Sequence, residues 1–390
     1  MNTAGPLNKL PLDALWRARA KKFGAFAGYD MPLEFEGLVA EHQWTRAHAG
    51  LFDVSHMGPC FFALPKGHEL EGEAAHAAIA GLIEQLVPAD IVGLAAGQVR
   101  YTTLLNADGG VLDDLMIARP AEPGAAGDLY IVVNAGCKCE DWALIEASTR
   151  GRAHLVRADD RALLALQGPG AASALCAVIP EHAGALDAMQ FMNVARYETE
   201  RFGRLTITRS GYTGEDGFEL LARAEHAQAI AEALLADARV KPIGLGARDS
   251  LRLEAGLCLY GHDLDETTSP IEAGLAWTIQ KRRREAGDFP GAARILRELK
   301  EGPVRRRVGI RPIEKAPARE GVEIFAGDEK IGVVTSGGFS PMLGAPISMG
   351  YVASAHAKPG VRVDLLVRGQ KRPAEIVTLP FQPHRYVRKP

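Results

Sequence analysis

The alternation of apolar and polar residues changes character near Val304. From there on, short apolar runs recur at regular spacing and are separated by turns rich in Gly and Pro. The strands predicted by this pattern cover residues 322–326, 331–336, 347–352, 361–367 and 374–379. Regularly spaced short strands with such turns are typical of a small β-barrel or sandwich. We therefore expect an all-β domain over about residues 300–390.

The first 280 residues mix the two periodicities without regular β–α–β alternation. Apolar residues at period two predict strands at 57–64, 98–105, 111–117, 129–133, 161–166, 205–210 and 218–221. Apolar residues at helical spacing predict helices at 12–23, 71–86, 140–148, 170–178, 226–237 and 246–257. The first of these helices is expected to end at Gly24 and Gly28. Such a mixture favours an α+β fold over a doubly wound one.

Composition narrows the class of protein. The chain has 390 residues, enough for two or three domains with their own cores, and a net charge of -3, which gives no case for nucleic acid as a partner. No apolar run approaches the roughly 20 residues of a membrane-spanning helix, and the basic N-terminal segment is not followed by the apolar stretch of a secretory signal. The five scattered cysteines indicate free thiols in a reducing compartment. We expect a cytoplasmic protein with no membrane partner.

Two patterns that might be taken for cofactor sites are weak. Gly168-Pro169-Gly170 follows a strand, as in a dinucleotide-binding loop, but proline occupies the turn and no acidic residue follows at about 20 positions. A tight strand-to-helix connection explains it better. Cys137 and Cys139 lie two apart, but no second Cys/His pair has ligand spacing. The prediction is no NAD, no flavin and no metal.

The segment 209–219, Arg-Ser-Gly-Tyr-Thr-Gly-Glu-Asp-Gly-Phe-Glu, is the most unusual in the chain. It combines three glycines, which let the backbone approach a ligand, with a tyrosine and three carboxylates. Carboxylates this close repel one another, so cations or hydrogen-bond donors must hold them. The alternative is an ordinary hairpin loop with a solvated acidic tip.

Four more segments share this density of polar and glycine residues: 52–57, 109–114, 133–136 and 246–257. On the last of them Arg248 and Arg252 share a helical face, as do Ser250 and Glu254. Together with Leu166-Gln167-Gly168-Pro169, Gly256-Leu257-Cys258-Leu259-Tyr260-Gly261 and Asp288-Phe289-Pro290-Gly291, this ordered set resembles the aminomethyltransferase family, the T-protein of the glycine cleavage system. The resemblance extends over essentially the whole chain.

The resemblance implies three domains in a cloverleaf around a central folate-binding hole, with a C-terminal all-β barrel. We place the first domain at 1–50 plus about 140–280, the second at about 51–139 and the barrel at about 300–390. It also implies an activity. The methylene carbon of an aminomethyl group on the lipoylated H-protein passes to tetrahydrofolate, ammonia leaves, and 5,10-methylenetetrahydrofolate and dihydrolipoyl H-protein form.

The resemblance selects Asp114 as the catalytic residue, since it matches the position nearest the reacting folate nitrogens. A partly buried carboxylate there can accept a hydrogen bond from the pterin and stabilise developing positive charge, help that is typically worth about 10²–10⁴-fold. The alternative is turn chemistry, but Asp108 already serves the turn Asn106–Gly110. Asp113 and Asp114 are expected to face opposite sides of the strand, so that only one lines a shared cavity.

The resemblance further implies a set of folate-binding residues. Glu219 matches the acid that anchors the pterin, Tyr212 is a neighbour of the ring, and Arg248 matches an arginine that contacts the ligand. Alternatives are a solvated strand position for Glu219, and ion pairing of Arg248 with Glu215, Asp216 or Asp249. The remaining matches are Trp277, Arg307, Tyr386, Met57 and Asn134. Arg307 is expected near the folate glutamate tail, and the aromatic side chains near the benzoyl ring.

Relatives with the same fold do other work, which leaves alternatives. Some are folate-dependent demethylases, some of them fused to flavin domains for which this chain has no room. Others are folate-binding proteins without catalytic activity that are linked to iron–sulfur cluster maintenance. A third alternative is a pure binding module that sequesters folate. The presence of Asp114 favours catalysis.

Overall fold

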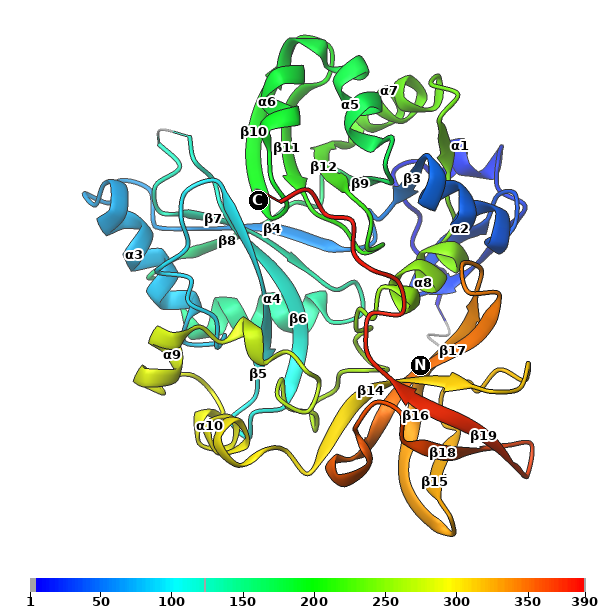
Figure 1. Cartoon of the computed structure of the whole chain (residues 1–390). Coiled ribbons are helices and arrows are strands. Elements are labelled where there is room, and N and C mark those ends of the chain that lie inside the picture. Colours follow the sequence, from blue (N-terminus) through cyan, green and yellow to red (C-terminus); the bar gives the residue numbers. More distant parts are fainter. Residues whose placement is uncertain (1–4, 123, 389–390) are drawn as a thin grey trace.

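The computed structural model describes residues 5–122 and 124–388. It contains a long mixed sheet flanked by helices and a closed barrel (Figure 1). In order across the sheet, the strands are β13 (Val240–Pro242), β3 (Ala49–Asp53), β9 (Arg161–Gln167), β12 (Gly217–Arg223), β11 (Gly203–Arg209), β10 (Asn193–Thr199), β5 (Gln98–Leu105), β6 (Val111–Arg119), β7 (Asp128–Val133), β4 (Gly58–Ala63) and β8 (His154–Arg157). The α+β prediction is confirmed.

The sheet is narrow at its middle. Strands β10 and β5 are aligned at a single residue pair, Asn193 with Gln98, whereas β10 and β11 pair over seven residues and β5 and β6 over eight. The sheet therefore has two halves, and each has its own helices and its own apolar core.

The first half packs against α1 (Asp13–Arg17), α5 (Ala171–Val178), α6 (Ala183–Ala188) and α7 (Ala224–Leu235). The second half packs against α3 (Gly72–Ile83) and α4 (Lys138–Ser148). Helices α2 (Leu38–Ala47) and α8 (Leu245–Glu254) pack on each other, and α9 (Lys281–Ala286) and α10 (Ala292–Glu301) lead to the barrel (Figure 1). Short 3₁₀ turns lie at Pro180–His182, Ala276–Thr278 and Ser354–His356.

Helix α4 and strand β8 belong to the second core, where Trp142, Ile145 and Ala153 are buried. The division made from the sequence places these residues with the first unit. The exact domain boundaries remain a prediction.

The barrel is closed by six strands: β14 (Arg305–Pro312), β17 (Ala345–Ala353), β16 (Glu329–Ser340), β15 (Glu323–Ala326), β18 (Arg362–Val367) and β19 (Gln370–Val377). Ile324, Val334, Val352, Leu365 and Ile376 fill its interior. This confirms the all-β domain predicted from the short apolar runs.

The helix predicted at 12–23 is wrong beyond its first turn. Helix α1 ends at Arg17, and residues Lys22–Phe26 form β1, which pairs with β2 (Tyr29–Glu34). Ala27 and Gly28 both have positive φ, 48° and 80°, which is the geometry of a tight two-residue hairpin turn. Gly28 therefore turns a hairpin and does not end a helix.

After the barrel, the chain runs back across the molecule to the first half of the sheet (Figure 1). Backbone hydrogen bonds hold this segment at Phe381 N–Glu254 O (3.0 Å), Arg385 N–Gly214 O (2.8 Å) and Phe191 N–Val387 O (2.7 Å). It thus ties α8 and the first half of the sheet to the barrel. None of the helices within residues 5–122 and 124–388 has the length and apolar character needed to cross a membrane.

Candidate active site

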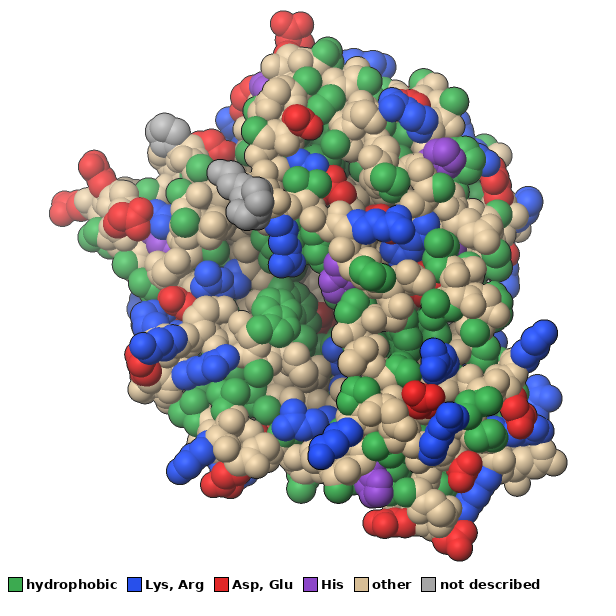
Figure 2. Space-filling view, viewed as in Figure 1, with side chains coloured by type: hydrophobic (Ala, Val, Ile, Leu, Met, Phe, Trp, Pro, Cys, Tyr) green, Lys and Arg blue, Asp and Glu red, His purple; other side chains and the backbone are tan. Residues whose placement is uncertain are grey.

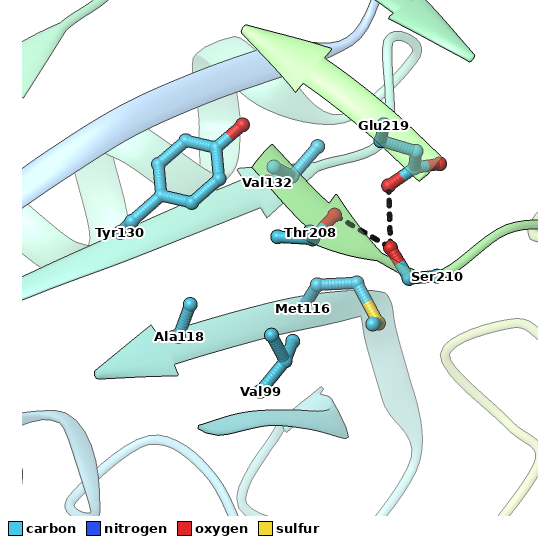
Figure 3. Close-up of a pocket in the computed structure, with 8 residues that line it drawn as sticks. All are labelled: Val99, Met116, Ala118, Tyr130, Val132, Thr208, Ser210 and Glu219. Carbon is cyan, nitrogen blue, oxygen red and sulfur yellow. Dashed lines mark hydrogen bonds between the residues drawn. The ribbon is translucent and has the colours of Figure 1, made fainter. Parts of the chain in front are cut away.

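The first part of the site combines residues of β12 and the end of β11 with residues of β5, β6 and β7. Ser210 Oγ donates to Glu219 Oε2 at 3.1 Å and lies 2.6 Å from Thr208 Oγ1 (Figure 3). Together with Val99, Met116, Ala118, Tyr130 and Val132, these residues line a small cavity. The cavity has space for about one water molecule, so a larger ligand requires its walls to move.

Arg248 on α8 faces the same region. Its guanidinium carbon lies 4.8 Å from the centroid of the Tyr212 ring, a distance typical of a cation–π contact. Within the described residues, its buried Nη1 has no hydrogen-bond acceptor. Burial raises the pKa of Glu219, while the charge of Arg248 and the Ser210 hydroxyl oppose that rise. The positive charge of Arg248 thus stabilises the charged form of Glu219 without a direct ion pair.

The other two carboxylates of segment 209–219 are structural. Arg46 Nη1 donates to Glu215 Oε1 at 2.9 Å, and Glu215 is only 2% exposed. Arg209 holds Asp216 with two hydrogen bonds of 2.9 and 2.7 Å. The alternative of a solvated acidic tip is therefore wrong.

The alternative role of Arg248, ion pairing with one of three acids of the sequence, is also wrong. Glu215 and Asp216 are held by the arginines just described, and Asp249 pairs with Arg252 at 2.8 Å. Ser250 and Glu254 do share a helical face as predicted, because both contact the ring of His42, at 2.8 and 2.9 Å.

The second part of the site centres on Asp114 in β6. The Tyr101 hydroxyl donates to Asp114 Oδ2 at 2.9 Å, and Asn134 Nδ2 donates to Asp114 Oδ1 at 2.8 Å. Burial and then the charge of Asp113 raise the pKa of Asp114 to about 7, although both hydrogen bonds work against this shift. Asp114 therefore changes its charge near neutral pH.

Asp113 and Asp114 differ in exposure, since Asp113 is 0% exposed and Asp114 is only partly buried. They are nevertheless not independent. The same Asn134 amide nitrogen lies 2.9 Å from Asp113 Oδ1 and 2.8 Å from Asp114 Oδ1. As expected for opposite sides of a strand, the two carboxylates differ in exposure. Contrary to that expectation, both contact the same Asn134 amide.

Tyr212 connects the two parts. Its hydroxyl donates to the carbonyl of Cys258, and its ring lies against Arg248. Burial raises the pKa of Tyr212, and the charge of Asp114 raises it further, so Asp114 is near enough to act on this hydroxyl. The structure thus brings five predicted residues into one region: Asp114, Asn134, Tyr212, Glu219 and Arg248.

Of the other four predicted residues, Trp277 and Met57 have neighbours in common with this group. Trp277 is 61% exposed and stacks on Tyr101, with ring centroids 5.6 Å apart. Met57 packs against the apolar cluster that contains Val99 and Tyr130. Their positions are compatible with the walls and rim of a ligand site.

Arg307 and Tyr386 are engaged elsewhere in this structure. Arg307 donates to the carbonyls of Ala273 (2.9 Å) and Gly256 (2.8 Å), which ties β14 to the preceding segments. Tyr386 stacks on Phe191 at 3.8 Å between ring centroids. Contact of either residue with folate stays a prediction.

Two site residues were not predicted. The first is Tyr101. The register of the β5–β6 hairpin places Thr103 opposite Asp114, so Tyr101 is the diagonal neighbour of Asp114. The pairing of the predicted hairpin could therefore have identified Tyr101 from the sequence. His56 is 2% exposed with an unpartnered Nδ1 among the described residues, and burial and the charges of Arg248 and Lys138 lower its pKa to about 3. It occurs in segment 52–57, of which only Met57 was selected.

Among the residues placed by the structure, no group of three or more His, Cys, Asp or Glu side chains is arranged to hold a metal ion. The polar side chains gathered at the site are carboxylates, an arginine, hydroxyls, an amide and the imidazole of His56.

Comparison with known proteins defines the class. Residues 12–283 match the family model "GCVT N-terminal domain", and residues 305–382 match the "Glycine cleavage T-protein C-terminal barrel domain". A crystal structure of the glycine cleavage system aminomethyltransferase T from Bartonella henselae is 42% identical, with a TM-score of 0.87, and covers 98% of this chain and 100% of its own.

Curated relatives agree over nearly full length. The mitochondrial aminomethyltransferase of Gallus gallus is 42% identical over an alignment of 388 positions that covers 97% of this chain and 94% of the relative. That of Homo sapiens is 41% identical over an alignment of 387 positions that covers 97% of this chain and 91% of the relative. The chain belongs to the glycine cleavage T-protein family and is an aminomethyltransferase of the glycine cleavage system.

Proposed function

We propose that the chain transfers the methylene carbon of the aminomethyl group on lipoylated H-protein to tetrahydrofolate. Ammonia is released, and the products are 5,10-methylenetetrahydrofolate and dihydrolipoyl H-protein. The observation that carries the proposal is Asp114, a carboxylate with a pKa of about 7 that is oriented by Tyr101 and Asn134.

The residues near Glu219 fit a pterin ring. Glu219 can accept hydrogen bonds from the donor edge of such a ring, in bidentate fashion when both oxygens take part. In the described chain, Arg248 Nη1 and the Tyr130 hydroxyl are buried without partners, a costly condition that a polar ligand would relieve. Tyr212, with Arg248 behind it, offers an aromatic face. We assign Glu219, Arg248 and Tyr212 to pterin binding.

Asp114 is assigned to the reaction itself. In its charged form, the carboxylate accepts a hydrogen bond from a folate nitrogen, which increases the electron density on that nitrogen. It then stabilises positive charge that develops as the new carbon–nitrogen bond forms. Tyr101 and Asn134 hold its two oxygens, so it needs little reorganisation during the reaction.

We infer that folate enters the site from the face of the molecule shown in Figure 2. Near the middle of that face is a recess with hydrophobic side chains inside and Lys and Arg side chains around it. We interpret it as the opening of the central hole between three domains. Met57 lines the passage, Trp277 and Tyr386 pack on the benzoyl ring of folate, and Arg307 meets its glutamate tail. The basic rim suits the negative charge of that glutamate.

The test uses the full chain with tetrahydrofolate and H-protein that carries the aminomethyl group. We expect ammonia and 5,10-methylenetetrahydrofolate to form in equal amounts, and the reverse reaction to proceed from ammonia, 5,10-methylenetetrahydrofolate and dihydrolipoyl H-protein. Tetrahydrofolate binding without turnover would refute the transferase and support a protein that sequesters folate. Turnover that does not require H-protein would refute the proposed partner.

The proposed location is the cytoplasm. All five cysteines are free thiols in the structure, as suits a reducing compartment. Cell fractionation with detection of the chain checks this, and recovery from a mitochondrial or secreted fraction would contradict it.

A further inference from the structure

A third carboxyl group lies behind Asp113 and has no part in the reaction proposed above. Asp141, in the first turn of α4, is 3% exposed and contacts the carboxyl group of Asp113. Its Oδ2 atom receives no hydrogen bond from any N–H or O–H donor among the described residues. Two buried carboxyl groups can share a hydrogen bond only when one of them is protonated.

The acceptors and donors show which of the two carries the proton. Asp113 already accepts from Asn134 N and Asn134 Nδ2, both at 2.9 Å, so it is satisfied as an anion. Among the described residues, Asp141 Oδ2 has no such donor. Burial and the charge of Asp113 raise the pKa of Asp141 far above its usual value. A proton on Asp141 that is donated to Asp113 is therefore the arrangement that satisfies both carboxyl groups.

The chain of contacts continues to the reacting carboxylate. Asn134 follows β7 directly, and its Nδ2 also lies 2.8 Å from Asp114 Oδ1 and 2.9 Å from the Asp114 carbonyl. An amide nitrogen has two hydrogens, so Asn134 Nδ2 can donate to both Asp113 and Asp114. Rotation of the Asn134 side chain would release Asp114, and the hydrogen bonds of Asn134 to Asp113 and to the Asp114 carbonyl oppose that rotation.

Resting on the proposed function, we propose that Asp141 and Asp113 are positioning residues: protonated Asp141 donates to Asp113, which fixes the Asn134 amide that orients Asp114. Neither acid contacts the ligand. The relay crosses from α4 through β6 to the residue after β7, so it also sets the distance between helix and sheet next to the site.

The titratable neighbours of Asp114 come from every element around it. They are Asp113, Asp141, Tyr101, Tyr212, Cys137 and Cys258. Asp113 is the neighbour that raises the Asp114 pKa by its charge. Removal of that charge is therefore expected to move the rising limb of the turnover–pH profile to lower pH, which reports how close the two carboxylates are. A fall in kcat at nearly constant KM, with rescue by an amide at position 141, separates a positioning role from a merely structural one.

The experiment compares Asp113→Asn, Asp141→Asn and Asp141→Leu in the full chain. Asp113→Asn is expected to lower kcat by about 10²-fold, the cost of a misplaced group, with KM for tetrahydrofolate nearly unchanged and the pH limb shifted to lower pH. Asp141→Leu should lower kcat about 10-fold. Asp141→Asn should restore most of that loss, because an amide also donates to Asp113.

The matched control is Glu140→Gln, which removes an exposed acid from the same helical turn and should leave kcat unchanged. An unshifted pH limb in Asp113→Asn, or equal losses in Asp141→Asn and Asp141→Leu, would overturn the relay. Thermal unfolding and tetrahydrofolate binding identify a variant that has failed to fold. If an Asp141 variant fails to fold, the turnover–pH profile of Asp113→Asn tests the proposal. Absence of turnover in the unmodified chain would instead refute the proposed function.

Discussion

Glu219 and Asp114 are partly buried carboxylates on two halves of one sheet, and they are held in different ways. Burial raises the pKa of Glu219, but the cation Arg248 and the Ser210 hydroxyl oppose the rise and favour the charged form. For Asp114, burial and then the charge of Asp113 both disfavour the charged form and raise the pKa to about 7. Their different environments therefore suit different roles. Glu219 suits binding, and Asp114 suits a reaction in which charge changes.

The largest expected effect comes from Asp114→Asn. The amide keeps the shape but has no negative charge, so kcat should fall by about 10²–10⁴-fold while the Kd for tetrahydrofolate changes little. Steady-state kinetics and calorimetric titration measure the two quantities. The control is Asp108→Asn, an exposed acid in the turn of the same hairpin. Equal losses of turnover and affinity would remove the distinction between the two carboxylates.

The complementary change is Glu219→Gln. Loss of a charged hydrogen-bond acceptor is typically worth about 1.5–3 kcal/mol, so we expect about 10- to 100-fold weaker tetrahydrofolate binding and a smaller change in kcat at saturation. Glu198→Gln, which changes an exposed acid on β10 in the same half of the sheet, serves as control. An unchanged dissociation constant would exclude Glu219 from the binding site.

The smallest effect is expected from Tyr101→Phe, and it concerns pH. If the Asp114 carboxylate is the active form, kcat rises with pH through about 7. Loss of the Tyr101 hydrogen bond destabilises the charged form, so the rising limb should move to higher pH, with a loss of about five-fold at pH 7. This direction is opposite to that expected for Asp113→Asn. A shift to lower pH would contradict the assigned contact.

The local features of the fold were predictable, because they depend on residues close in sequence. The β5–β6 hairpin, the barrel strands and the shared face of Ser250 and Glu254 all follow from short-range periodicity. The error at residues 22–26 arose because the pairing of β1 with β2 overrides helical spacing.

The long-range part of the site could not be read in the same way. Segment 209–219 showed that its acids needed partners, but nothing local pointed to Arg46, which is 169 positions from Glu215. The contact between Asp141 and Asp113 likewise depends on how α4 packs against the sheet. Resemblance to a family selected Asp114, whereas its pKa depends on burial that only the fold provides.

The narrow junction between β10 and β5 has a mechanical consequence. Two backbone hydrogen bonds of 2.8 Å cross it, from Val99 N to Met192 O and from Val194 N to Gly97 O, and Val99 also lines the cavity beside Glu219. Val99 and Val194 also belong to a buried apolar cluster that includes residues from both halves of the sheet, among them Tyr130 and Leu221. Because so little backbone pairing joins β10 to β5, packing of these side chains carries most of the connection between the halves. A ligand that widens the cavity beside Glu219 must therefore displace side chains that also hold the two halves together.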